Sequence, residues 1–158
     1  MEVANPKILI VDDRPNWRTT LETLLKSYGY AVTVAANIFE ALEALEQGPY
    51  HAAILDVRLD DLDDDNREGL STVLISAHQK YPQMSFIVIS SYYSEAEVRG
   101  FVPPDVKLFY FHKNSFPVDK LLNTLSQLAH SNARQILSRF YRRICQWTKN
   151  MLSSLRTH

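Results

Sequence analysis

Five polar residues stand at, or just after, the ends of apolar segments of strand length: Asp12, Asp13, Asp56, Ser90 and Lys113. Three carboxylates brought together repel one another, so such a cluster is costly unless a cation is bound or a proton is retained. Mg²⁺ suits this role because it prefers oxygen ligands and is commonly held by one or two carboxylates. A carboxylate can also act as a nucleophile and form an aspartyl phosphate, provided that positive charge neutralises the phosphoryl oxygens. Mg²⁺, the Lys113 ammonium and the Ser90 hydroxyl would supply that neutralisation.

The elements that must position these residues alternate between strand and helix through the first 130 residues. Strands are predicted at 7–11, 31–35, 52–56, 85–90 and 107–111. Segments of helical period lie between them, and a fifth helix begins near Pro117. This alternation predicts an α/β domain over residues 1–130 with a doubly wound, five-stranded parallel sheet. In such a sheet the ligand site lies beyond the carboxyl ends of the strands, where the five polar residues stand.

Four short motifs carry a family resemblance, and each contains one or more of the polar residues. The segments ILIVDD, AAILDVRL, FIVISS and FYFHK resemble the receiver domains of response regulators in order, spacing and strand context. The resemblance covers about residues 5–130. It implies a flavodoxin-like sheet with the strand order 2-1-3-4-5.

The resemblance also implies a role for each matching position. Asp56 would be the phosphoacceptor, Ser90 would sense the phosphoryl group, and Lys113 would pair with it. Tyr110, three residues before the lysine, resembles the aromatic residue that moves inward when the hydroxyl residue shifts. The Mg²⁺ ligands would be Asp12, Asp13, Asp56 and the main-chain carbonyl of Arg58.

The implied function is that of a phosphorylation-dependent signalling switch. A histidine kinase or histidine phosphotransfer protein would donate the phosphoryl group, and the phosphorylated domain would bind a downstream protein differently. Because its output is binding, the domain is not expected to be an enzyme beyond catalysing its own phosphorylation and dephosphorylation. The chain has no signal-peptide pattern and no apolar run of membrane-spanning length, so we expect a cytoplasmic protein.

The sequence departs from the family pattern at three places. The customary proline after the acceptor is Asp60, which opens a lengthened acidic loop over residues 60–68. Asn114 follows the lysine where the family usually has proline, so we expect a trans peptide bond there. Arg58 and Tyr92, two residues past the acceptor and the hydroxyl residue, are large enough to restrict the approach of water. They predict a long-lived phosphorylated state.

Residues 131–158 form a separate, basic element. Residues 1–130 hold all 18 acidic residues against 11 lysines and arginines, whereas residues 131–158 hold six basic residues and no acidic one. An apolar stripe at helical spacing runs along this segment through Ile136, Phe140, Ile144, Trp147, Met151 and Leu155. It predicts an amphipathic helix, with self-association as the first choice. The alternatives are docking onto the acidic receiver, partner binding, a lead-in to an output domain and a membrane surface. No helix-turn-helix pattern indicates nucleic-acid binding.

Two other classes of function compete with the switch. A pseudo-receiver would keep the fold and act as a phosphorylation-independent interaction module, which the complete set of five polar residues disfavours. A Mg²⁺-dependent phosphatase with an aspartyl nucleophile would resemble a DxDx[TV] motif on the first strand, but this chain has DDRP there. Cys145 is the only cysteine, so an internal disulfide is excluded.

Overall fold

A computed structural model describes the backbone of residues 5–59 and 68–128 of the 158-residue chain. The basic helix predicted over 131–158 and most of the acidic loop lie outside these ranges. In the part of the chain that is described, no helix is long and apolar enough to cross a membrane.

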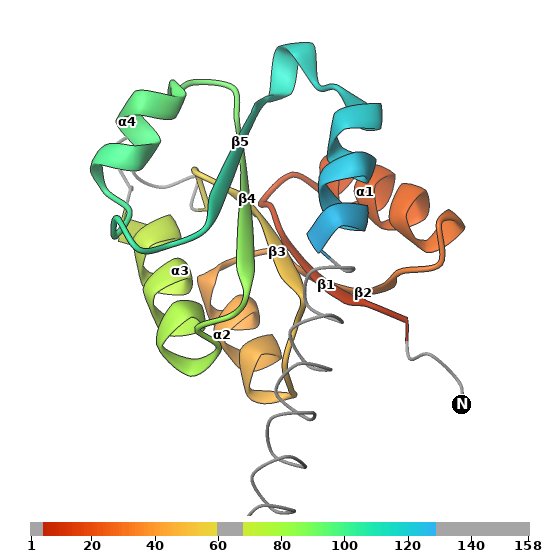
Figure 1. Cartoon of the computed structure of the whole chain (residues 1–158), viewed down its shortest axis with the longest axis horizontal. Coiled ribbons are helices and arrows are strands. Elements are labelled where there is room, and N and C mark those ends of the chain that lie inside the picture. Colours follow the sequence, from red (N-terminus) through yellow and green to blue (C-terminus); the bar gives the residue numbers. More distant parts are fainter. Residues whose placement is uncertain (1–4, 60–67, 129–158) are drawn as a thin grey trace, which may run out of the picture.

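Five parallel strands form one sheet in the order β2-β1-β3-β4-β5, which confirms the predicted topology (Figure 1). The strands are β1 (Lys7–Val11), β2 (Ala31–Ala35), β3 (Ala52–Asp56), β4 (Ser85–Ser90) and β5 (Leu108–His112). The bounds of β1 to β4 match the prediction, whereas β5 lies one residue later than predicted. Lys107 is exposed, and His112 instead continues the pairing with β4 opposite Ser90.

The helices begin where the local sequence satisfies their first amides. They are α1 (Pro15–Ser27), α2 (Ile38–Glu46), α3 (Glu68–Lys80) and α4 (Glu95–Gly100), and residues 118–128 are also helical. A proline opens α1, where its missing N–H costs nothing. The Asn37 side chain caps α2, and Ser94 forms a reciprocal capping box with Glu97 at the start of α4.

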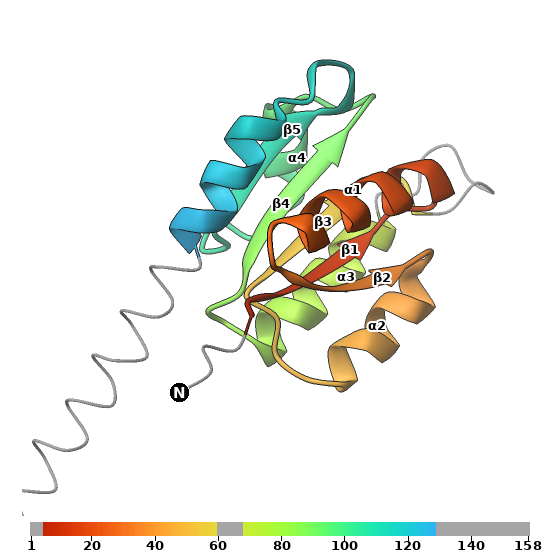
Figure 2. The same ribbon diagram turned by 90° about the vertical axis from the view of Figure 1, so that its right-hand side faces the viewer.

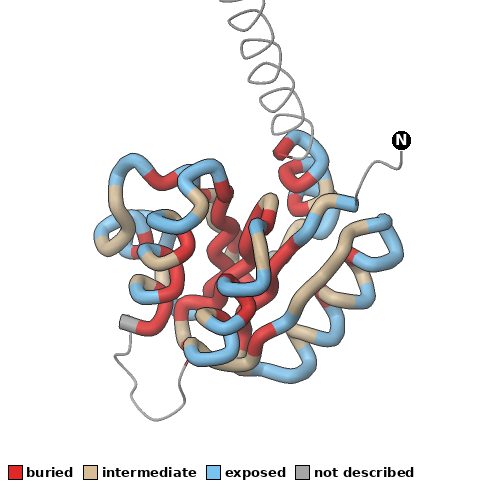
Figure 3. Tube along the Cα trace, turned by 90° about the horizontal axis from the view of Figure 1, so that it is seen from below, coloured by how far each residue is buried: buried red, intermediate tan, exposed pale blue. Residues whose placement is uncertain are grey.

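Helices cover both faces of the sheet, and each face has its own apolar core (Figure 2). The helices α2, α3 and α4 pack on one face, and α1 and residues 118–128 pack on the other. Every residue of β3 and β4 is buried, as expected for central strands of a doubly wound sheet (Figure 3). Because the strands are parallel, their carboxyl ends share one edge, and the predicted polar residues gather there.

Gly69 marks a close approach at the start of α3. A Cβ atom at this position would lie 2.9 Å from Ile38 Cδ1 of α2 and 3.5 Å from Leu59 Cβ. Leu59, three residues past the end of β3, is itself fully buried. The start of α3 is therefore seated directly on α2 and on the segment that leaves β3.

Candidate functional site

The Lys113 ammonium joins two carboxylates that come from different strands. Its Nζ donates to Asp12 Oδ2 at 2.7 Å and to Asp56 Oδ2 at 2.6 Å. Asp12 follows β1, Asp56 ends β3, and Lys113 begins a short 3₁₀ turn, Lys113–Ser115, after β5. All three side chains are buried, with exposed fractions of 3%, 8% and 3% for Asp12, Asp56 and Lys113. Buried charges of this kind are tolerated because they are paired and hydrogen-bonded.

Main-chain amides hold the carboxylates of Asp12 and Asp56, and Arg18 holds the backbone that carries Asp12 and Asp13. The second oxygen of Asp12 accepts from the Arg14 amide at 2.9 Å, and that of Asp56 accepts from the Val57 amide at 2.7 Å. The Arg18 guanidinium donates to the carbonyls of Asp12 and Asp13 at 2.6 and 2.8 Å. One carboxylate oxygen from each of Asp12, Asp13 and Asp56 lies within 4.8 Å of the other two. This group is compatible with a hard divalent cation.

The pKa of Asp56 shows that its charged form is disfavoured in this site. The pKa of Asp56 is raised to about 6, chiefly by burial and also by the nearby Asp12 and Asp13, against the lowering effect of Lys113. Three carboxylates thus lie close to one another, and their mutual repulsion disfavours the charged form of each. A bound cation would relieve that repulsion.

Ser90 sits at the end of β4 and holds the loop that leads to α4. Its hydroxyl oxygen accepts from the amides of Tyr92 and Tyr93 at 3.1 and 2.9 Å. The hydroxyl of Tyr110, on β5, donates to the carbonyl of Tyr93. Hydrogen bonds through Tyr93 thus link Ser90 and Tyr110, the two residues that the family resemblance assigns to the switch.

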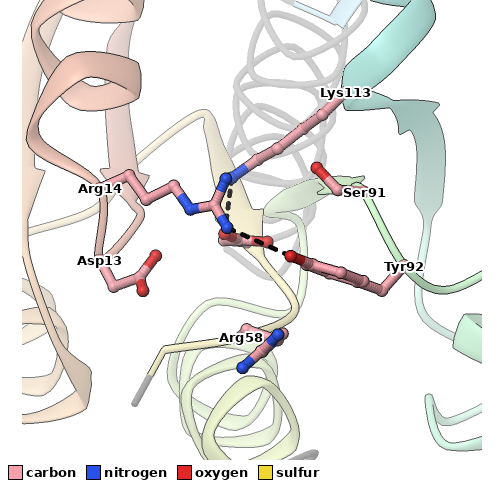
Figure 4. Close-up of a pocket in the computed structure, with 7 residues that line it drawn as sticks. Asp13, Arg14, Arg58, Ser91, Tyr92 and Lys113 are labelled. Atoms are coloured by element: carbon pink, nitrogen blue, oxygen red, sulfur yellow. Dashed lines mark hydrogen bonds and ion pairs between the residues drawn. The ribbon is translucent and has the colours of Figure 1, made fainter. Parts of the chain in front are cut away.

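A small pocket opens above Asp56, and two of its lining residues were not predicted from the sequence. The lining residues are Asp13, Arg14, Asp56, Arg58, Ser91, Tyr92 and Lys113 (Figure 4). The Arg14 guanidinium and the Tyr92 hydroxyl meet across it at 3.5 Å, and the Arg58 guanidinium lies 4.9 Å from the centre of the Tyr92 ring. Arg14 and Ser91 were missed, although each directly follows a nominated residue. Trp17, whose ring contacts Lys113, was also not predicted as a site residue.

The peptide bond before Asn114 is trans, as expected, because the described residues contain no cis peptide bond. The amide of Asn114 donates to His112 Nδ1 at 3.3 Å, which caps the turn that carries the lysine. The absence of proline therefore does not keep Lys113 from reaching both carboxylates.

The site and the sheet agree with a comparison against known protein families. Residues 8–115 match the response regulator receiver domain, which is more than half of the chain. The chain belongs to this family. It is a receiver domain of two-component signalling, a class that acts in signalling rather than as a classical enzyme.

The NtrX-like and ZraR relatives are longer proteins, of which this chain matches a minor part. The NtrX-like response regulator of Rickettsia bellii is 38% identical over 85 residues, which are 54% of this chain and 17% of that protein. The transcriptional regulatory protein ZraR of Klebsiella oxytoca is 31% identical over 130 residues, which are 78% of this chain and 26% of that protein.

Solved receiver structures share the fold over most of the chain. A CheY-like receiver domain protein from Methanospirillum hungatei has a TM-score of 0.67 and 26% identity, covering 82% of this chain and 98% of that one. The response regulator protein TrrA from Thermotoga maritima, solved in complex with Mg²⁺-BeF, has a TM-score of 0.62 and 27% identity, covering 78% and 98%.

Neutralising Asp56 is expected to stabilise the cation-free protein. Between the pKa of Asp56 in the unfolded chain and its raised pKa in the folded protein, the folded state holds more protons than the unfolded state. The free energy of unfolding of wild type should therefore fall as the pH rises from about 4 to about 6. Asp56→Asn should avoid this loss and unfold at pH 7 with a free energy about 1–3 kcal/mol higher. Urea denaturation with a chelator at pH 4 to 7 checks this. Equal pH dependence of the two proteins would contradict it.

Proposed function

We propose that this domain is a phosphorylation-dependent switch in which Asp56 accepts the phosphoryl group. The observation that carries the proposal is the buried Lys113 ammonium bonded to both Asp56 and Asp12 at the carboxyl edge of the sheet. A carboxylate beside a fixed cation can attack phosphorus, because charge that develops on the phosphoryl oxygens is stabilised where it forms.

The donor would be a phosphohistidine on a histidine kinase or a histidine phosphotransfer protein. A bond forms between phosphorus and an Asp56 carboxylate oxygen while the bond between phosphorus and the donor imidazole nitrogen breaks. The electron pair of the broken bond leaves with the imidazole, which can then take a proton from solvent. Lys113, bonded to Asp56 before the reaction, can turn to a phosphoryl oxygen afterwards.

Mg²⁺ fits the donor set of this site. The carboxylates of Asp12, Asp13 and Asp56 and the main-chain carbonyl of Arg58 would hold it, which gives the oxygen ligands that the ion prefers. When bound, the ion neutralises charge on the phosphoryl oxygens. The TrrA structure, which contains Mg²⁺-BeF, supports this assignment by its similarity to the chain.

The switch would pass from Ser90 to β5 through the hydrogen bonds of the β4–α4 loop. A hydroxyl can donate one hydrogen while accepting others, so Ser90 can donate to a phosphoryl oxygen while it holds the amides of Tyr92 and Tyr93. Any shift of the Ser90 oxygen toward Asp56 pulls on those amides. Since the Tyr93 carbonyl accepts from Tyr110, the pull changes the position of Tyr110 on β5. The altered surface would then bind a downstream protein.

The primary test is mass spectrometry of the purified chain with Mg²⁺ and acetyl phosphate. We expect one added phosphoryl mass, which Asp56→Asn lacks because it removes the nucleophilic oxygen. Absence of the adduct in wild type, with Mg²⁺ binding demonstrated by calorimetry, would contradict the proposal and favour a phosphorylation-independent interaction module. Turnover of a generic phosphate ester would indicate the phosphatase class.

The coupling through Ser90 predicts separate effects of two neighbouring serines. Ser90→Ala should still be phosphorylated on Asp56, but it should lose the changes in amide chemical shift that phosphorylation produces at Tyr93 and along β5. Ser91→Ala is the matched control, because Ser91 lines the pocket while the acceptor of the two loop amides stays in place. Unchanged shifts along β5 in phosphorylated wild type, or full shifts in Ser90→Ala, would contradict this route.

The side chains over the pocket predict a long-lived phosphorylated state. In hydrolysis a water oxygen attacks phosphorus, the bond to the Asp56 oxygen breaks, and the carboxylate and inorganic phosphate are released. Tyr92, held by Arg14 and Arg58, stands over the pocket where that water must arrive.

Tyr92→Ala should therefore shorten the lifetime of the phosphorylated protein about threefold to tenfold, a barrier change of about 0.6–1.4 kcal/mol. The decay of the phosphorylated mass after removal of acetyl phosphate measures this lifetime. Tyr28→Ala, at the far end of α1, is the control, because Tyr28 is similarly exposed but lies outside the pocket. Equal lifetimes in wild type and Tyr92→Ala would show that Tyr92 does not limit hydrolysis.

A further inference from the structure

The Lys113 side chain needs a constraint that its own backbone does not supply. Lysine carries a compact charge on a flexible four-carbon stem, so its direction depends on what surrounds the ammonium. The two carboxylates on one side, at 2.6 and 2.7 Å, account for two of its three donor directions. The 3₁₀ turn that carries the lysine fixes only its Cα.

The Trp17 ring provides the remaining contact. Lys113 Nζ lies 5.2 Å from the ring centroid of Trp17, within the range of a cation–π interaction, and tryptophan is the strongest aromatic partner for a cation. The ammonium is almost fully excluded from water, so the interaction is not weakened by solvent. The ammonium is therefore held between two carboxylates and an aromatic ring.

Two further aromatic rings hold Trp17 against the turn. Trp17 packs edge to face on Phe116, with centroids 5.4 Å apart and an interplanar angle of 79°. Phe116 directly follows the 3₁₀ turn and also packs on Phe111 of β5, at 6.2 Å. The same cluster thus anchors both the ring and the backbone that carries Lys113.

The residue next to Trp17 holds the opposite side of the site. Arg18 donates to the carbonyls of Asp12 and Asp13, so the first turns of α1 bind the loop that carries these carboxylates. Two successive residues of one helix therefore contact the Lys113 ammonium and the backbone of the loop that carries the carboxylates. A helix is rigid on this scale, which keeps the ring and the carboxylate loop in fixed relation.

We propose that Trp17 is a positioning residue for Lys113: its ring fixes the direction of the ammonium so that it remains aimed at Asp56 and at the phosphoryl group it receives. The inference rests on the proposed phosphorylation of Asp56. It assigns to an α1 aromatic residue a role in the rate of phosphoryl transfer, in addition to its packing against Phe116.

The kinetic test compares two substitutions of Trp17 in the full chain. Trp17→Leu keeps an apolar side chain but removes the aromatic face, so phosphorylation by acetyl phosphate should slow about fivefold to tenfold. Trp17→Phe retains a weaker aromatic face and should recover most of that rate. The affinity for Mg²⁺, measured by calorimetry, should change less than about twofold, because the carboxylates of Asp12 and Asp56 keep their amide contacts and Arg18 still holds the loop carbonyls. Tyr28→Leu, remote on the same helix, is the control.

A purely structural role would give a different result. Trp17→Leu and Trp17→Phe would then lower the melting temperature while both are phosphorylated at the wild-type rate well below it. Equal rates for folded wild type and folded Trp17→Leu would overturn the proposal. If Trp17→Leu does not fold, the proposal would be overturned by two results together. These are a wild-type rate in Trp17→Phe and a tryptophan emission that does not respond to the loss of Lys113, measured as follows.

The spectroscopic contact is measured without phosphorylation. The chain has two tryptophans, so in a Trp147→Phe background all tryptophan emission comes from Trp17. Lys113→Met should shift that emission, whereas Asp13→Asn, which changes the charge of the site by one unit in the opposite direction without removing the ammonium, should shift it less. Identical emission in the Lys113→Met and parent proteins would overturn the contact. Failure of wild type to be phosphorylated would instead count against the proposed function, and the two failures are thereby distinguished.

Discussion

The buried ammonium of Lys113 is the interaction on which the rest of the site depends. Without it, the buried carboxylates of Asp12 and Asp56 would face each other and Asp13 uncompensated by its charge, and even with it the pKa of Asp56 is raised to about 6, chiefly by burial. The lysine can reach them only because β1, β3 and β5 are parallel strands of one sheet that end at the same edge. The order and direction of the strands thus determine which charged side chains lie close to one another.

From this cluster, contacts extend along two sides of the sheet. On one side, the Ser90 hydroxyl accepts from the amide of Tyr93, and the carbonyl of Tyr93 accepts from the Tyr110 hydroxyl. On the other, Trp17 and Phe116 join the lysine to α1. A hydrogen-bonded loop can exchange partners at small cost, whereas an interlocked aromatic cluster resists displacement. The first side is therefore suited to movement and the second to holding the reactive groups still.

The sequence predicted what depends on short-range pattern. Strand bounds, helix starts and the polar residues at strand ends follow from hydrophobic period and capping chemistry, and the parallel sheet then brings Asp12, Asp56 and Lys113 together. It did not predict contacts that depend on how elements approach one another. Arg14 and Tyr92 are 78 positions apart, and their meeting depends on side-chain rotamers at the pocket. Trp17 lies at helical spacing with the buried leucines of α1, and a periodic pattern cannot distinguish a core contact from a contact with a buried cation.

The close seating of Gly69 on Leu59 has a consequence for the loop between β3 and α3. Leu59 and Gly69, which stand on either side of residues 60–67, lie next to each other. The two ends of that loop are therefore close in space whatever the number of residues between them. The entropy of closing a loop grows only slowly with its length, about 0.6 kcal/mol for each doubling. Residues can thus be gained or lost there during evolution without shifting α3 or the strands. The charge bordering the site can vary in this way while the frame that holds Asp56 stays the same.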